Sequence, residues 1–183
     1  MKNLYILMLM VCFAAIAQEE GRFRFGINAG YAKSADADGY SFNIEPKYNI
    51  EDNMNVGLRL GYTGLKQDVS FSDGIIEYND EVAIEMISVG ATYDYYFDEL
   101  TGGAFTPYAG AGLTMNAISS DYGENENKFG ALLRGGFEWG KFRVSAEYNF
   151  MSSEEYDDGE NTIEYKYGYF MIGVGIFIGG GTW

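Results

Sequence analysis

Hydrophobic and polar residues alternate along most of the chain after residue 21. The pattern is clearest in residues 133–150, LRGGFEWGKFRVSAEYNF, where two alternating runs meet at Gly140 and Lys141. The apolar face of this hairpin carries Phe137, Trp139, Phe142, Val144, Tyr148 and Phe150, and the opposite face carries Arg134, Glu138, Arg143 and Glu147. A period of two indicates β-strands joined by a tight turn.

Similar alternation predicts eight strands, and helical periodicity is not convincing beyond the first residues. The expected strands cover residues 22–31, 40–48, 54–64, 82–97, 105–118, 133–139, 142–150 and 163–178. Four long polar connections, at 32–39, 65–81, 119–127 and 152–162, alternate with short ones. In the last segment two phases compete, because Tyr165, Tyr167 and Tyr169 alternate in one and Phe170, Ile172, Val174, Ile176 and Ile178 in the other. We favour the second, and a bulge near Tyr169 would reconcile both. The pattern predicts an all-β, eight-stranded, antiparallel up-and-down sheet.

Glycine indicates which face of this sheet is the inside. The glycines opposite the apolar face are Gly26, Gly30, Gly57, Gly61, Gly90, Gly110, Gly112, Gly130, Gly136, Gly173 and Gly175, whereas only Gly135 and Gly168 share it. A closed sheet of eight strands is barely wide enough for side chains, so small residues should line it. Roughly 40 apolar side chains then point outward, far more than a soluble monomer tolerates. We therefore expect a transmembrane β-barrel whose apolar face meets lipid.

Charged residues in the strands support the same orientation. The glycine-bearing face carries Arg24, Lys47, Arg59, Arg134 and Arg143 against Glu45, Asp94, Glu138 and Glu147. Buried charges are tolerated when they are paired and hydrogen-bonded, so this near balance fits a packed polar lumen. We expect Glu138 and Glu147 to be the partners of Arg134 and Arg143.

The first seventeen residues have the pattern of a secretory signal peptide. Lys2 precedes an apolar run from Leu4 to Ala17, which is too short to span a bilayer and ends in Ala15-Ile16-Ala17. We expect cleavage after residue 17, which leaves one barrel domain at 18–183. The only cysteine, Cys12, would be removed with the signal, so the mature chain would contain no disulfide.

Composition narrows the function. Without Lys2 the chain has 11 basic and 27 acidic residues, a net charge of −16, so nucleic acid and anionic lipid are poor partners. The chain has no histidine, the commonest general base, and we expect neither an enzyme nor a cofactor.

The four long connections hold fifteen acidic residues against Lys33 and Lys66. Their oxygens, at DADG (36–39), DYGENEN (121–127) and EEYDDGEN (154–161), could hold Ca²⁺ or a surface ligand, although none of these segments matches an EF-hand loop. A solvated anionic rim that resists aggregation is the interpretation we favour.

Four segments carry a family resemblance: FRFGINAGYA at 23–32, TPYAGAGLTM at 106–115, RGGFEWGKFRVSAEY at 134–148 and the closing YGYFMIGVGIFIGGGTW. They resemble the porin-like outer-membrane β-barrel domain family, the small OmpA/OmpX-type barrels. The chain departs from a last strand that ends on a terminal aromatic residue, because Gly179 to Gly181 precede Trp183. The resemblance implies an integral protein of a Gram-negative outer membrane, in contact with outer-membrane lipid and, during biogenesis, with the barrel-assembly machinery.

Two roles remain open at this stage. The first is a structural or surface-interaction role of a monomeric barrel with periplasmic termini, a charge-paired lumen and acidic extracellular loops. The alternative is a narrow porin-like channel for small solutes or ions. Eight strands leave an interior that side chains fill, which favours the first.

Overall fold

The computed structural model describes residues 20–35, 37–72, 77–97, 105–120, 126–152, 154–157, 162–165 and 168–179. The expected signal peptide lies outside these residues, so its cleavage stays a prediction. Within the described part of the chain, no helix is long and apolar enough to cross a membrane.

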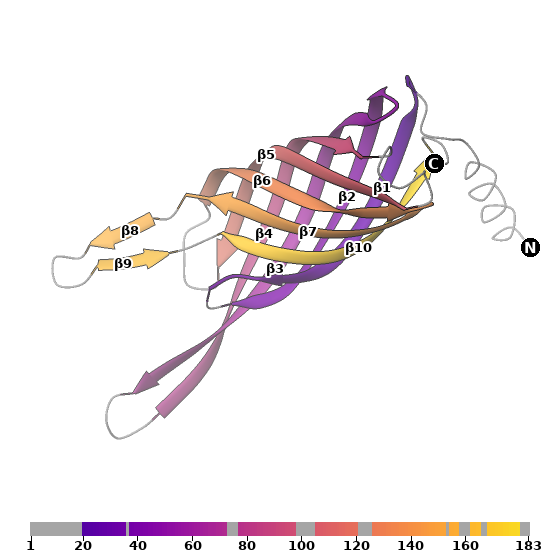
Figure 1. Ribbon diagram of the computed structural model, residues 1–183. Helices are drawn as coiled ribbons and strands as arrows, with labels where there is room; N and C mark the ends of the chain where they lie inside the picture. The colour runs from indigo at the N-terminus through magenta and orange to yellow at the C-terminus, as the bar shows by residue number, and fades with distance from the viewer. Residues whose placement is uncertain are drawn as a thin grey trace, which may run out of the picture.

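Eight strands close into an antiparallel barrel, as predicted (Figure 1). They are β1 (Phe23–Lys33), β2 (Asp38–Glu51), β3 (Met54–Ser72), β4 (Glu77–Tyr96), β5 (Thr106–Ser120), β6 (Glu126–Trp139), β7 (Phe142–Met151) and β10 (Tyr169–Gly179). Each strand pairs with its neighbours along the chain, and β1 closes the ring against β10 from Arg24↔Gly179 to Lys33↔Phe170. A second, two-stranded sheet contains β8 (Glu154–Asp157) and β9 (Thr162–Tyr165).

The short turns lie at the same end of the barrel as the start of its first strand and the end of its last. Residues 52 and 53 join β2 to β3, and Gly140 and Lys141 join β6 to β7. Gly140 has a φ of 59°, a left-handed conformation that glycine adopts without strain. The start of β1 pairs with the end of β10 at this same end, which we call the turn end.

At the opposite end, which we call the hairpin end, the structure corrects the expected loop at 65–81. The strands β3 and β4 continue through most of that segment and stay paired as far as Ser72↔Glu77. Pairing of β3 with β2 stops at Lys66, so the last six pairs project roughly 20 Å beyond the barrel at 3.3 Å per residue (Figure 1). Their polar composition resembles a loop because a ladder in water needs no apolar face.

The other long connections also contain more structure than the alternation indicated. The strand β6 already begins at Glu126, and β8 and β9 form a small hairpin in and beyond the expected loop at 152–162. The single strand predicted at 163–178 is therefore wrong, because β9 and β10 are separate strands. The preferred phase of β10 is correct, since Phe170, Ile172, Val174 and Ile176 are exposed and Tyr169 is buried.

The outer face of the barrel is an apolar band bounded by charges. Large apolar side chains are exposed on this face, for example Phe25 on β1, Leu58 on β3, Val89 on β4, Met115 on β5 and Val174 on β10. In β1 the band runs between Arg22 and Lys33. These eleven steps span roughly 36 Å along the strand, or about 28 Å along the axis at a tilt near 40°, close to the apolar band of about 25 Å of outer-membrane barrels.

Candidate functional site in the barrel lumen

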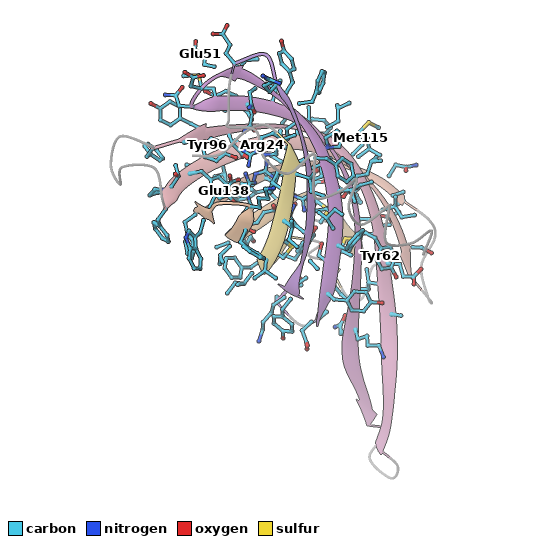
Figure 2. The ribbon with its side chains drawn as sticks, turned by 90° about the vertical axis from the view of Figure 1, so that its right-hand side faces the viewer. Arg24, Glu51, Tyr62, Tyr96, Met115 and Glu138 are labelled. Atoms are coloured by element: carbon cyan, nitrogen blue, oxygen red, sulfur yellow. The ribbon has the colours of Figure 1, made fainter. Side chains whose placement is uncertain are left out.

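All nine charged residues expected in the lumen are buried inside the barrel. They are Arg24 on β1, Glu45 and Lys47 on β2, Arg59 on β3, Asp94 on β4, Arg134 and Glu138 on β6, and Arg143 and Glu147 on β7. The most exposed of them, Arg134, keeps only 7% of its surface accessible. Figure 2 shows Arg24 and Glu138 within the barrel, near Tyr96, whereas Met115 and Tyr62 lie on its outer face.

Seven of the nine form one connected network toward the turn end. Asp94 is its centre: it accepts hydrogen bonds from Nε of Arg134 at 2.7 Å and Nη2 of Arg143 at 3.1 Å, and it pairs with Lys47. Arg134 also holds Glu45 in a bidentate contact, with distances of 2.7 and 3.1 Å. Charge-assisted bidentate contacts are among the strongest hydrogen bonds in proteins.

The network continues through Glu138 to the strand that closes the barrel. Glu138 accepts from Nη2 of Arg24 at 2.7 Å, from Nε of Arg143 at 2.8 Å and from the hydroxyl of Tyr96 at 3.0 Å. Arg24 and Glu138 are 114 residues apart in sequence. Because β10 and β7 lie between β1 and β6 in the barrel, this contact crosses the lumen.

Aromatic rings fill the space around the guanidinium groups. The guanidinium carbon of Arg143 lies 4.1 Å from the ring centroids of both Tyr108 and Phe177. Arg24 packs 4.8 Å from Phe177. Such cation–π contacts strengthen where water is excluded. Sequence reasoning did not single out these rings, or Tyr96, although they share the alternation phase of the lumen charges.

The remaining two charges form a separate pair, which corrects one expected partnership. Arg59 donates to Glu147, which also accepts from Nδ2 of Asn149 at 2.8 Å. Glu138 does contact Arg143, as expected, but Glu147 does not take Arg134 as its partner. These two residues face each other in the register of β6 and β7, yet the side chain of Arg134 reaches across the lumen to Glu45 and Asp94 instead.

Glycine makes room for these contacts. In the register, Gly110 lies between Asp94 on β4 and Arg134 on β6. A Cβ at Gly110 would collide with the Asp94 carboxylate and lie 2.7 Å from a backbone oxygen of Tyr93. The missing side chain is therefore what allows Arg134 and Asp94 to meet over β5.

A second lumen glycine has the same role at the neighbouring level. A Cβ at Gly57 would lie 2.8 Å from Oγ1 of Thr92, 3.0 Å from Cγ of Lys47 and 3.2 Å from Oε1 of Glu45. The hydroxyl of Thr92 donates to Glu45 across this position. The glycine partition in the sequence thus reflects real close packing inside the barrel.

The lumen toward the hairpin end contains an apolar cluster beside buried polar side chains, which the sequence analysis missed; Lys128 there is only 6% exposed and pairs with Glu126 at 2.9 Å. This hairpin-end cluster contains Ala32, Ala37, Leu65, Met86, Ile118, Tyr169 and Met171. A signal was present, because Leu65, Met86 and Met171 share the phase of the inward residues rather than that of the lipid-facing ones. The interior therefore has a network of charges at the turn end, and an apolar cluster with buried polar neighbours at the hairpin end.

Side chains fill most of the interior of the barrel. A cavity of about 10 Å³, the volume of about one water, lies between Arg134, Arg143 and Glu147. The described residues include no group of three or more side chains that could hold a metal ion. The acidic segments proposed for Ca²⁺ lie largely outside the residues whose side chains are described, so that idea stays a prediction.

The chain belongs to the outer membrane protein beta-barrel domain family, whose family model matches residues 4–176. The protein is therefore an outer-membrane β-barrel protein of a Gram-negative bacterium, and the resemblance inferred from the sequence is confirmed. No curated protein is significantly similar to the chain.

Solved structures of small outer-membrane barrels share the fold. The crystal structure of Neisserial surface protein A has a TM-score of 0.60 and 22% identity, covering 87% of this chain and 99% of that one. OprG of Pseudomonas aeruginosa has a TM-score of 0.54 and 15% identity, covering 89% and 98%. The N-terminal barrel domain of Pseudomonas aeruginosa OprF has a TM-score of 0.50 and 17% identity, covering 88% and 98%. None of the three is named as an enzyme; the absence of enzymatic activity stays a prediction.

Proposed function

We propose that this protein is a closed, monomeric outer-membrane barrel with a structural and surface-interaction role. The observation that carries the proposal is the filled lumen. Seven buried charged side chains form one connected network at the turn end, and the hairpin-end cluster fills part of the other half with apolar side chains. An ion would have to break buried pairs and then pass this cluster, and both steps are costly.

The interacting part of the protein is then the surface at the hairpin end. The paired extension of β3 and β4 reaches roughly 20 Å past the barrel at 3.3 Å per residue. The sequence of the four long connections is strongly acidic, which would disfavour anionic partners and favour cationic ones. In this proposal the hairpin end faces the outside of the cell, and the turn end with both termini faces the periplasm.

Planar-bilayer recording of the refolded mature protein tests the closed lumen. We expect no stable conductance steps, with a large porin recorded under the same conditions as the positive control. Stable, reproducible steps would contradict the closed lumen and support the narrow channel instead.

Labelling of single cysteines in intact cells tests the orientation. The expected mature chain has no cysteine, so each introduced thiol is the only one. We expect a membrane-impermeant maleimide to modify Ser72→Cys at the projecting hairpin and to spare Lys141→Cys at the turn end. Modification of Lys141→Cys alone would reverse the orientation.

A further inference from the structure

The small cavity in the lumen lies where the two charged clusters approach each other. Arg134 and Arg143, which belong to the seven-residue network, line one part of it, and Glu147, which pairs with Arg59, lines another. No direct hydrogen bond between described residues joins the network to the Arg59–Glu147 pair. The cavity of about 10 Å³ lies between the two ion-pair systems and has room for about one water molecule.

Two buried polar atoms in the lining residues lack a hydrogen-bond partner among the residues that the structure describes. They are the hydroxyl of Tyr108 and Oδ1 of Asn28, on side chains that are 3% and 4% exposed. The amide of Asn28 is held by its Nδ2, which donates to Oδ1 of Asn43 at 3.0 Å. Buried polar groups in folded proteins nearly always find a partner, so two orphans around one cavity indicate that a ligand completes them.

We propose that this cavity is a binding site for a single ordered water molecule, which joins the two ion-pair systems into one continuous network. The water donates to Oδ1 of Asn28, and the hydroxyl of Tyr108 donates to the water. It accepts from Arg143, whose hydrogen bonds to the other described residues use Nε and Nη2 and leave Nη1 available. With the Glu147 carboxylate as a further acceptor, the site offers a water the two to four partners that it needs.

The mixture of donors and acceptors selects water over an ion. An anion would gain from Arg143 and Tyr108 but would face the Glu147 carboxylate and the carbonyl oxygen of Asn28. A cation would face two guanidinium groups. Water is the ligand that can donate toward Asn28 and accept from Arg143 at the same position.

The decisive experiment is a crystal structure of the refolded native protein, from matched crystals grown in sodium chloride and in sodium bromide. We expect one density peak in the cavity, within hydrogen-bond distance of the Tyr108 hydroxyl and Oδ1 of Asn28, without bromide anomalous signal. A bromide peak would overturn the proposal in favour of an anion site. A cavity without density would overturn it in favour of a dry void.

A variant pair tests the same water in detergent micelles. Ser145 lines the cavity, and Ser145→Val would fill it with a methyl group, whereas Ser88→Val makes the same change at an inward-facing serine outside it. We expect magnetisation transfer from water to the Asn28 side-chain amide in the native protein and in Ser88→Val, and its loss in Ser145→Val. Persistence in Ser145→Val, or absence in the native protein, would contradict the site. If Ser145→Val does not refold, the native crystals decide.

Discussion

Replacing Arg134 by methionine removes the cation that holds two buried carboxylates. Three hydrogen bonds disappear: two to Glu45, at 2.7 and 3.1 Å, and one to Asp94, at 2.7 Å. Methionine keeps most of the volume, so the change isolates charge from packing. Glu45 would keep Lys47, at 3.6 Å, as its remaining cation, and Asp94 would keep Lys47 and Arg143.

Breaking a buried ion pair costs about 3 to 5 kcal/mol, because the remaining charge stays desolvated without its partner. The residual contacts with Lys47 keep Arg134→Met within that range rather than above it. We therefore expect the free energy of unfolding to fall by about 3 to 5 kcal/mol, more than a hundredfold in the unfolding equilibrium constant.

The assay is urea unfolding of the protein refolded into lipid vesicles, followed by tryptophan fluorescence. Trp139 lies on the outer face and is 68% exposed in the barrel, so its emission reports whether it sits against lipid. Lys33→Met, at an exposed lysine at the hairpin end of β1, is the control and should change stability by less than about 0.5 kcal/mol.

A second variant separates lost pairing from general damage. In the double variant Arg134→Met with Glu45→Gln, one of the two stranded carboxylates becomes neutral, so part of the loss should be recovered. We expect an interaction energy above about 1 kcal/mol in the double-mutant cycle. Strictly additive losses, or a loss below about 1 kcal/mol for Arg134→Met alone, would refute the assignment of Arg134 as a supporting charge of the lumen.

Three further predictions concern the rest of the barrel. Gly110→Ala should greatly reduce the refolding yield, because its Cβ would meet the Asp94 carboxylate. Gly135→Ala should refold normally, because its Cβ would meet only a backbone oxygen of Tyr108 at 3.5 Å. Equal yields of the two variants would contradict the close packing at Gly110. Leu113→Arg, on the exposed face of β5, should lower the free energy of unfolding in lipid by about 2 to 4 kcal/mol, as measured by urea unfolding. Ser119→Arg, near the hairpin end, should lower it by at most about 1 kcal/mol. Equal losses would show that Leu113 is not deep in the bilayer. Titration calorimetry in detergent should give no heat with Ca²⁺ if the acidic segments are a solvated rim, and a saturable heat would establish a site there.

Alternation and the glycine partition together predicted the architecture, because a period of two fixes which face each residue occupies once the inside is known. The glycine partition supplied that knowledge, and it assigned residues as different as Arg59 and Asp94 to the same interior. The strand boundaries at the hairpin end could not be predicted in this way. Residues such as Gln67 and Glu81 lie in a ladder beyond the barrel whose sequence is largely polar, so it lacks the clear alternation that marks the other strands.

Individual partners were also beyond the sequence. Neighbours in the register, such as Arg134 and Glu147, are the natural guess, but arginine side chains are long enough to cross a narrow lumen. Arg59 reaches Glu147 over 88 residues of sequence, and Arg134 reaches Glu45 over 89. Such choices depend on barrel closure and on the tilt of the strands, neither of which the alternation determines.

The cross-lumen ion pairs also act as a check on strand alignment during assembly. A slip of one residue in a strand that carries a lumen charge would turn that charged side chain toward lipid and the strand's apolar side chains inward. For β7, Arg143 and Glu147 would both leave their partners, Glu138 and Arg59, and would enter the hydrocarbon. The correctly aligned barrel is thus separated from its nearest misaligned forms by several buried charges at once, so the same residues that fill the interior also determine the register in which it closes.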